Sequence, residues 1–216
     1  MDSLIQFYDI FLSSLRWLIG LSIGCVLGLF FAILGSYKYS KKPSKIINDF
    51  LRAIPIIGLV PVIQMNIGIN EFGKIGLIAW AVMFPVWITV RTALNKKFDD
   101  SELMLSGANI IGYKYFRLYT FPKLFSGFLN GIEIAIGIAW LAVVAGEWVG
   151  TYTQGFWSGG LGYKLILGYE LNNWEMVHYN LLIFGILGFT SAHLWRFIIK
   201  TLFKNNKSFN PIIKMN

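Results

Sequence analysis

Two glutamates carry the most informative chemistry in this 216-residue sequence, because they interrupt an otherwise uncharged run from Leu124 to Val149. A charge at the depth of a bilayer costs at least about 2 to 3 kcal/mol, so its side chain normally faces a cavity or a partner. Glu133 and Glu147 lie 14 residues apart, which at about 100° per residue places them within about 40° of one helix face, with Trp140 between them. These three residues form one stripe along the helix. The stripe predicts either a path for a solute or an interface between subunits. In the structural alternative, Glu133 is paired within the fold and Glu147 reaches outward to the membrane surface.

Three prolines, Pro55, Pro61 and Pro85, stand within apolar runs and predict broken helices inside the membrane. The carbonyl groups that a proline frees must be satisfied by neighbouring helices or by water in a cavity. Broken helices therefore often line pathways, and we add Pro55 and Pro61 to the stripe as candidate pathway residues. A kink that serves only packing is the alternative, since proline is commoner in membrane helices than in soluble ones.

The sequence predicts neither a catalytic set nor a metal site. His178 and His193 do not have ligand spacing with each other or with Cys25, and no nucleophile can be matched with a base. The stretch from Gly68 to Lys74 fits the spacing of a phosphate-binding loop, but Ile75 stands where a serine or threonine would hold magnesium. We interpret this stretch as a tight connection between helices. These absences argue against the alternative of a membrane-embedded enzyme that uses the two glutamates.

The composition predicts that most of the chain meets lipid. Hydrophobic residues make up 56% of the sequence and charged residues 14%, against about 25% charged in an ordinary soluble domain. A helix needs roughly 20 apolar residues to cross about 30 Å of hydrocarbon, and five charge-poor runs approach that length. We therefore predict an all-α membrane protein with five transmembrane helices, in a single domain over residues 1–216. The predicted spans are about 11–37, 53–70, 75–91, 124–149 and 176–199.

The basic residues predict how these spans are oriented, because loops rich in lysine and arginine stay on the inner side of the membrane. Of the 19 basic residues, 16 fall in the segments 38–52, 91–123 and 196–214, which five alternating spans assign to one side. The sequence therefore predicts an N-terminus outside and a C-terminus inside. This asymmetry accounts for the net charge of +8 and argues against a nucleic-acid partner.

Two connections between the predicted spans are longer than the roughly 2 to 8 residues usual in helical bundles. The inner connection, about 92–123, has acids that can start a helix and glycines that interrupt it, and we expect Pro122 to end it. The outer connection, about 150–175, interleaves glycines with aromatic residues. It predicts a re-entrant or surface segment with a short helix around Leu161 to Leu171.

Several short motifs follow one another in a specific order. Arg52-Ala53-Ile54-Pro55 is followed by the stretch from Ile67 to Ile75, by GIEIAIGIAWLAVVAGE from Gly131 to Glu147, and by Gly160-Leu161-Gly162-Tyr163. Together they resemble the permease subunits of bacterial ABC importers of the nitrate, sulfonate and taurine type. The resemblance covers nearly the whole chain.

This resemblance implies the five-helix core of type I ABC importer permeases, in the bacterial cytoplasmic (inner) membrane. It also implies that the inner connection is a coupling segment that docks on an ATPase subunit, with an acid and a glycine at the matching positions. The residues expected to make this contact are Asp100, Glu102, Leu103, Met104, Gly107 and Pro122.

The resemblance further implies three partners: two ABC ATPase subunits, a second permease copy or a paralogue, and an extracytoplasmic substrate-binding protein. ATP and magnesium would bind the ATPase, so this chain would need no cofactor and would not itself be an enzyme. The implied solute is a small anion such as nitrate, a sulfonate or taurine. A vitamin or pyrimidine precursor stays open, because two acids on one stripe would repel anions. A membrane scaffold without transport is the alternative from another class.

Overall fold

The computed structural model describes residues 2–36, 41–66, 70–95, 112–148 and 159–203 of the chain. Every regular element in these ranges is a helix, which confirms the predicted all-α class. In chain order the elements are α1 (Asp2–Gly35), α2 (Lys41–Arg52), α3 (Ile56–Asn66), α4 (Glu71–Asn95), α6 (Tyr113–Tyr115), the π-helix η1 (Phe116–Thr120), α7 (Phe121–Trp148), α8 (Leu161–Glu170) and α9 (Trp174–Phe203).

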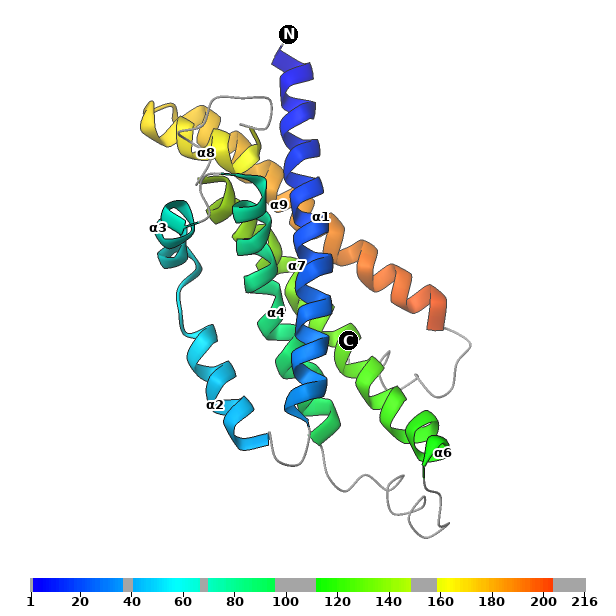
Figure 1. The fold of residues 1–216 in the computed structure, drawn as a ribbon. Helices are drawn as coiled ribbons and strands as arrows, with labels where there is room; N and C mark the ends of the chain where they lie inside the picture. The colour runs from blue at the N-terminus through cyan, green and yellow to red at the C-terminus, as the bar shows by residue number, and fades with distance from the viewer. Residues whose placement is uncertain (1, 37–40, 67–69, 96–111, 149–158, 204–216) are drawn as a thin grey trace.

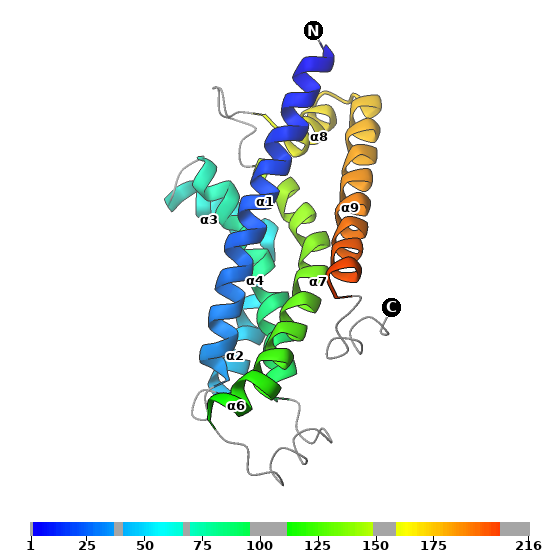
Figure 2. The ribbon, with the colours of Figure 1, turned by 90° about the vertical axis from the view of Figure 1, so that its right-hand side faces the viewer.

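The helices α1, α4 and α7 form the centre of the fold and run side by side along its length (Figures 1 and 2). In lipid, helices associate through close packing, which small residues at the contact permit. On α7, Gly127, Gly131, Ala135 and Ala139 are all buried. A Cβ added at Gly131 would lie 2.8 Å from Val86 Cα on α4. This face of small residues is therefore used for packing against α4.

Four helices are long and apolar enough to cross a membrane, and α2 with α3 gives a fifth span if the bent pair is counted as one. The four are Phe7–Gly35, Glu71–Asn95, Tyr113–Trp148 and Trp174–Phe203. All four begin earlier than the charge-poor runs suggested. The reason is that charged residues such as Glu71 lie inside the helices; Glu71 itself is paired with Arg16 and Lys74.

The second predicted span differs most from the structure. In place of one span over 53–70, α2 and α3 meet at an angle of 80°, with Pro55 in the break between them. The predicted start was wrong because α2 carries Lys45, Asp49 and Arg52, which a search for charge-free runs excludes. The pair lies to one side of the α1, α4 and α7 bundle (Figure 1).

The start of the fourth span corrects a second expectation. Pro122 does not end a helix; it is the second residue of α7, within one helical run from Tyr113 to Trp148. The π-helix η1 comes directly before α7 and changes the hydrogen-bond register there. A proline, which lacks an N–H, is tolerated at such a change of register and in a first helical turn.

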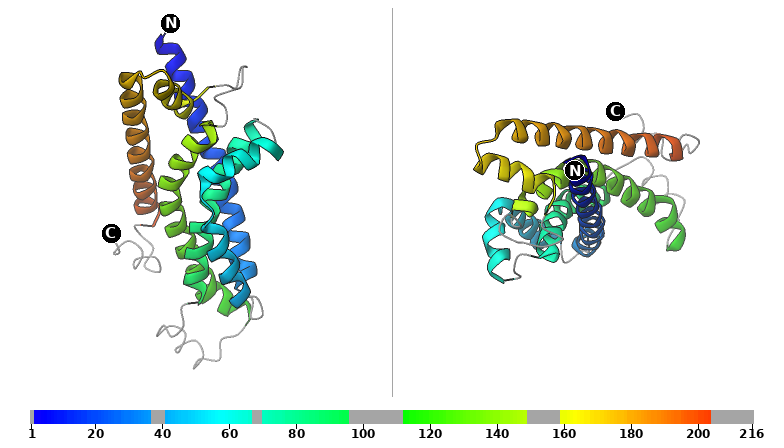
Figure 3. Two further views of the ribbon diagram at one scale, coloured as in Figure 1. Left: turned by 90° about the vertical axis from the view of Figure 1, so that its left-hand side faces the viewer. Right: turned by 90° about the horizontal axis from the view of Figure 1, so that it is seen from above.

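The helix α8 occupies the range expected for a short helix in the outer connection and lies across the end of the bundle that carries the N-terminus (Figure 3). The last helix, α9, starts at the same end and runs back along α7. Its outward face exposes large apolar side chains, among them Leu181, Leu182 and Phe189. Such a face suits contact with lipid or with another membrane helix.

Candidate functional site

A group of charged side chains is buried at the end of the bundle that carries the N-terminus. Arg16 of α1 donates from Nη1 to Glu147 Oε1 of α7 at 2.7 Å, and the two side chains are only 2% and 1% exposed. Ser13, one turn earlier on α1, donates to both oxygens of the same carboxylate at 2.7 and 3.0 Å. A buried ion pair is stable only when its remaining hydrogen-bonding groups are satisfied as well.

The guanidinium of Arg16 also reaches α4. Its Nε and Nη2 groups donate to the two oxygens of Glu71 at 2.7 and 2.8 Å, which is the bidentate geometry that arginine forms with carboxylates. Lys74 donates to Glu71 Oε1 at 2.8 Å from one turn further along α4. Asn70 accepts a hydrogen bond from the Gly73 N–H at 2.9 Å, so it caps the start of α4. This part of the stretch that resembles a phosphate-binding loop is therefore a helix start.

The same cluster holds the start of α8. Three N–H groups there, of Gly160, Leu161 and Gly162, donate at 2.7 to 2.8 Å to side chains from other helices. Their acceptors are Asp9 Oδ1, Ser13 Oγ and Glu147 Oε2, respectively. The first N–H groups of a helix have no partner within it, and they favour negative charge nearby.

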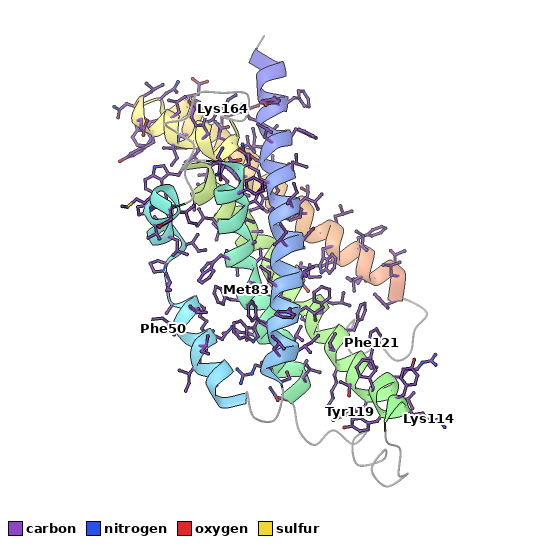
Figure 4. All side chains as sticks on the ribbon, viewed as in Figure 1. Phe50, Met83, Lys114, Tyr119, Phe121 and Lys164 are labelled. Carbon is purple, nitrogen blue, oxygen red and sulfur yellow. The ribbon has the colours of Figure 1, made fainter. Side chains whose placement is uncertain are left out.

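Two further contacts belong to this set. Arg16 Nη1 donates to the Gly159 carbonyl at 2.6 Å, and Lys164 of α8 forms an ion pair with Asp9 at 2.5 Å. Lys164 is labelled on α8 beside α1 in Figure 4. Gly160 has a φ of 129°, a backbone conformation that residues other than glycine rarely adopt.

We call Asp9, Ser13, Arg16, Glu71 and Glu147 the polar cluster. It joins α1, α4, α7 and α8, and its three acids are matched by Arg16, Lys74 and Lys164. Because its charges are balanced and mostly enclosed, the polar cluster is suited to holding four elements together. The alternative in which Glu147 reaches outward to the membrane surface was therefore wrong.

The other two members of the predicted stripe contact α9. Glu133 accepts a hydrogen bond from Arg196 Nε at 2.8 Å. Trp140 donates from Nε1 to Ser191 Oγ at 3.0 Å, and its ring stacks on Trp17 of α1 with centroids 5.2 Å apart. All three stripe residues therefore have partners in their own chain. Their part in a pathway stays a prediction.

Comparison with known proteins gives this arrangement its context. Residues 24–204 match the family described as "Binding-protein-dependent transport system inner membrane component". The chain belongs to this family. The match covers most of the chain, from the middle of α1 to just beyond the end of α9.

The names of individual relatives in the family specify two kinds of solute. A protein named as the aliphatic sulfonates transport permease SsuC of Bacillus subtilis is 26% identical over 92% of this chain and 70% of its own length. SsuC of Escherichia coli is 25% identical over 65% of this chain and 51% of its own length. The formylaminopyrimidine transport permease ThiX of Halalkalibacterium halodurans is 25% identical over 80% of this chain and 68% of its own length.

Membership in this family makes the chain a multi-pass component of the cytoplasmic (inner) membrane with a role in transport. Of the residues expected to couple such a component to an ATPase, Pro122 lies in the first turn of α7. The other five, Asp100, Glu102, Leu103, Met104 and Gly107, lie outside the described residues. The coupling contact therefore stays a prediction.

The pathway candidates Pro55 and Pro61 lie on the bent pair, Pro55 in the break and Pro61 within α3, and both are exposed. Sequence reasoning missed Asp9, Ser13, Arg16 and Glu71 as site residues. One available signal was Arg16 itself, a lone arginine next to an apolar run, which in lipid needs an acid as partner.

Proposed function

We propose that this chain is the permease subunit of an ATP-binding cassette importer. The observation that carries this proposal is the family match over residues 24–204, which spans the helices of the bundle. In the proposed assembly two permeases form a pathway at their interface, two cytoplasmic ATPase subunits bind ATP with magnesium, and an external binding protein delivers the solute. The second permease is either another copy of this chain or a paralogue.

The coupling step would pass through the inner connection, about 92–123. Closure of the two ATPase subunits on ATP would move this segment, with Asp100, Glu102 and Gly107 at the contact. The movement would reach the membrane through α7, because Tyr113 to Trp148 form one continuous helical run. The pathway would then open first to one side of the membrane and afterwards to the other.

We further propose a small anion of the sulfonate class as the solute, with nitrate and taurine as related candidates. Support comes from the two SsuC relatives, whose names specify aliphatic sulfonates. A pyrimidine precursor is the second candidate, which the ThiX relative favours at similar identity. Since the polar cluster neutralises Glu147 with Arg16, this acid does not oppose passage of an anion.

The test is to purify a tagged copy of the chain in mild detergent from its native membrane and to identify the proteins that come with it. The proposal expects an ABC ATPase at two copies for every two permeases. Reconstituted with its binding protein, this complex should take up a solute only when ATP is present. A chain that purifies alone, or with a partner that is not an ATPase, would contradict the proposal and favour a scaffold.

Variants in the coupling segment test the same proposal by removing the expected contact with the ATPase. Glu102→Ala and Gly107→Leu should reduce ATP-dependent uptake strongly while the chain still inserts into the membrane. If both variants transport as the parent does, the assignment of the coupling segment is wrong.

A further inference from the structure

A second arginine occupies a very different position from Arg16. Arg52 is the last residue of α2, directly before the 80° bend, and its side chain is 53% exposed. Its ion pair is with Asp49, one turn earlier on α2, at 3.6 Å. This distance is longer than that of a charge-assisted hydrogen bond, so the guanidinium keeps most of its capacity to donate.

Arg52 lies at the level of the middle of two spans. It shares a cavity with Trp80 and Phe84, which fall near the middle of the 25-residue helix α4, and with Ile134 at the middle of α7. Figure 4 shows that Phe50, two residues before Arg52, lies at a similar level along the bundle to Met83 of α4. A charged side chain at this depth normally faces a water-filled cavity or a partner, because lipid cannot solvate it.

The cavity has a volume of about 380 Å³ and lies between the α2–α3 bend, α4 and α7. We call it the bend cavity. Its walls are mainly apolar, with Trp80 and Phe84 on one side and Ile134 and Ile138 on the other. Arg52 is the one charged side chain among the described residues that line it. Glu133, next to Ile134 in sequence, is paired with Arg196 of α9.

The lining of the bend cavity predicts what it can bind. A cationic fork and apolar walls are complementary to a solute with an anionic head and a short apolar body.

From this geometry we infer that the bend cavity binds the transported solute during its passage, and that Arg52 holds the anionic group. The solute class is an organic anion with a short aliphatic body, such as an alkanesulfonate. Arginine suits this task because its planar fork matches two oxygens of a sulfonate or carboxylate. The inference rests on the proposed function and adds to it a binding site and its specificity.

The experiment uses the complete transporter, with its ATPase and binding protein, in proteoliposomes. Uptake is measured per reconstituted complex for ethanesulfonate, hexanesulfonate, nitrate and formylaminopyrimidine. The parent should take up at least one of the organic anions when ATP is present. No ATP-dependent uptake of any solute by the parent would contradict the proposed function, whereas uptake of formylaminopyrimidine alone would overturn only the inference about an anion site.

Arg52→Gln removes the charge and should lower uptake of the sulfonates about 10- to 100-fold, the range for losing one hydrogen bond to a charged group. Arg52→Lys keeps the charge without the fork and should restore part of the rate. Lys45→Gln is the matched control, since it removes one exposed positive charge from the same helix away from the cavity. Normal uptake by Arg52→Gln, an equal loss in Lys45→Gln, or no difference between the two Arg52 variants would each overturn the inference.

A size variant tests the cavity apart from the charge. Ile138→Trp would fill part of the space between α7 and the bend, so uptake of hexanesulfonate should fall several-fold more than that of ethanesulfonate. A merely structural effect of the substitution would reduce both rates alike. Equal losses for the two sulfonates would therefore show that the bend cavity is not where the solute binds.

Discussion

Two arginines of this protein lie in contrasting surroundings. Arg16 is 2% exposed and donates to Glu71, Glu147 and the Gly159 carbonyl at 2.6 to 2.8 Å. Arg52 is 53% exposed, and its contact with Asp49 is 3.6 Å long. A guanidinium that donates four hydrogen bonds within the fold, as Arg16 does, holds helices together, whereas one with free donors can bind something else.

The helices around the two residues differ in the same way. The polar cluster joins four elements that are distant in sequence, and it includes the backbone at the start of α8. The bent pair contacts the bundle less extensively than α1, α4 and α7 contact one another, and its α3 packs there through Val60 against Leu77 and Ala145. In a transporter we therefore expect the cluster to stay fixed while the region of the bend changes with the solute.

The largest effect should come from Glu147→Gln. The variant keeps the shape of the side chain but leaves Arg16 buried opposite a neutral amide. Removing one partner of a buried pair costs about 3 to 5 kcal/mol, and since Arg16 retains Glu71 we expect the lower end of this range. The measurement is the free energy of unfolding of the purified chain in detergent.

Glu175→Gln is the matched control, because Glu175 is an exposed acid in the first turn of α9. It should change the free energy of unfolding by at most about 0.5 kcal/mol. The double variant Arg16→Met with Glu147→Leu should be less destabilising than the sum of its two single variants, because it leaves no buried charge unpaired. Strict additivity would mean that the pair contributes nothing as a unit.

A smaller loss is expected from Gly162→Ala. The added Cβ would lie 2.9 Å from Glu147 Oε2 and 3.0 Å from Val144 Cα, so the start of α8 would have to move away from α7. Crowding of this kind costs about 1 to 3 kcal/mol. Gly137→Ala on α7 is the control, since nothing lies within 4 Å of a Cβ added there. A Gly162→Ala variant as stable as this control would show that α8 is not held against Glu147.

The sequence predicted the helical class and the short helix at α8, and it left pairing within the fold as one of two alternatives for Glu133. It did not predict the partner of Glu147, because Arg16 lies 131 residues away and only the packing of α1 against α7 brings the two together. Periodicity reports which face of a helix a residue occupies and says nothing about which helix covers that face.

The boundaries of the second span could not be predicted for a different reason. A search for charge-free runs assumes that charges mark the ends of a span, whereas α2 carries Lys45, Asp49 and Arg52 along one short helix beside the bundle. The bend itself was indicated by Pro55. Its angle of 80° depends on how α3 packs against α4 and α7, which is information at the level of the fold.

An intermediate effect is expected for the ion pair between α7 and α9. Glu133→Gln breaks a contact whose side chains are 28% and 50% exposed, so both charges remain partly accessible. Interhelical pairs of this kind contribute at most about 1 kcal/mol, and the free energy of unfolding should fall by that amount or less. Arg196→Gln should give the same change. A loss as large as that of Glu147→Gln would show that Glu133 is enclosed in the assembled protein, for instance by a second permease.

The smallest effect is expected at Asp49, the partner of Arg52. Both side chains of this pair are about half exposed, and pairs one turn apart on a helix contribute only about 0.2 to 0.5 kcal/mol. Asp49→Asn should therefore leave the free energy of unfolding within about 0.5 kcal/mol of the parent, as measured by the same denaturant titration. This result would separate Arg52 from Arg16, since only Arg16 would depend on its acidic partner for the stability of the fold. A loss of several kcal/mol would place Arg52 and Asp49 among the structural charges and remove the contrast between the two regions.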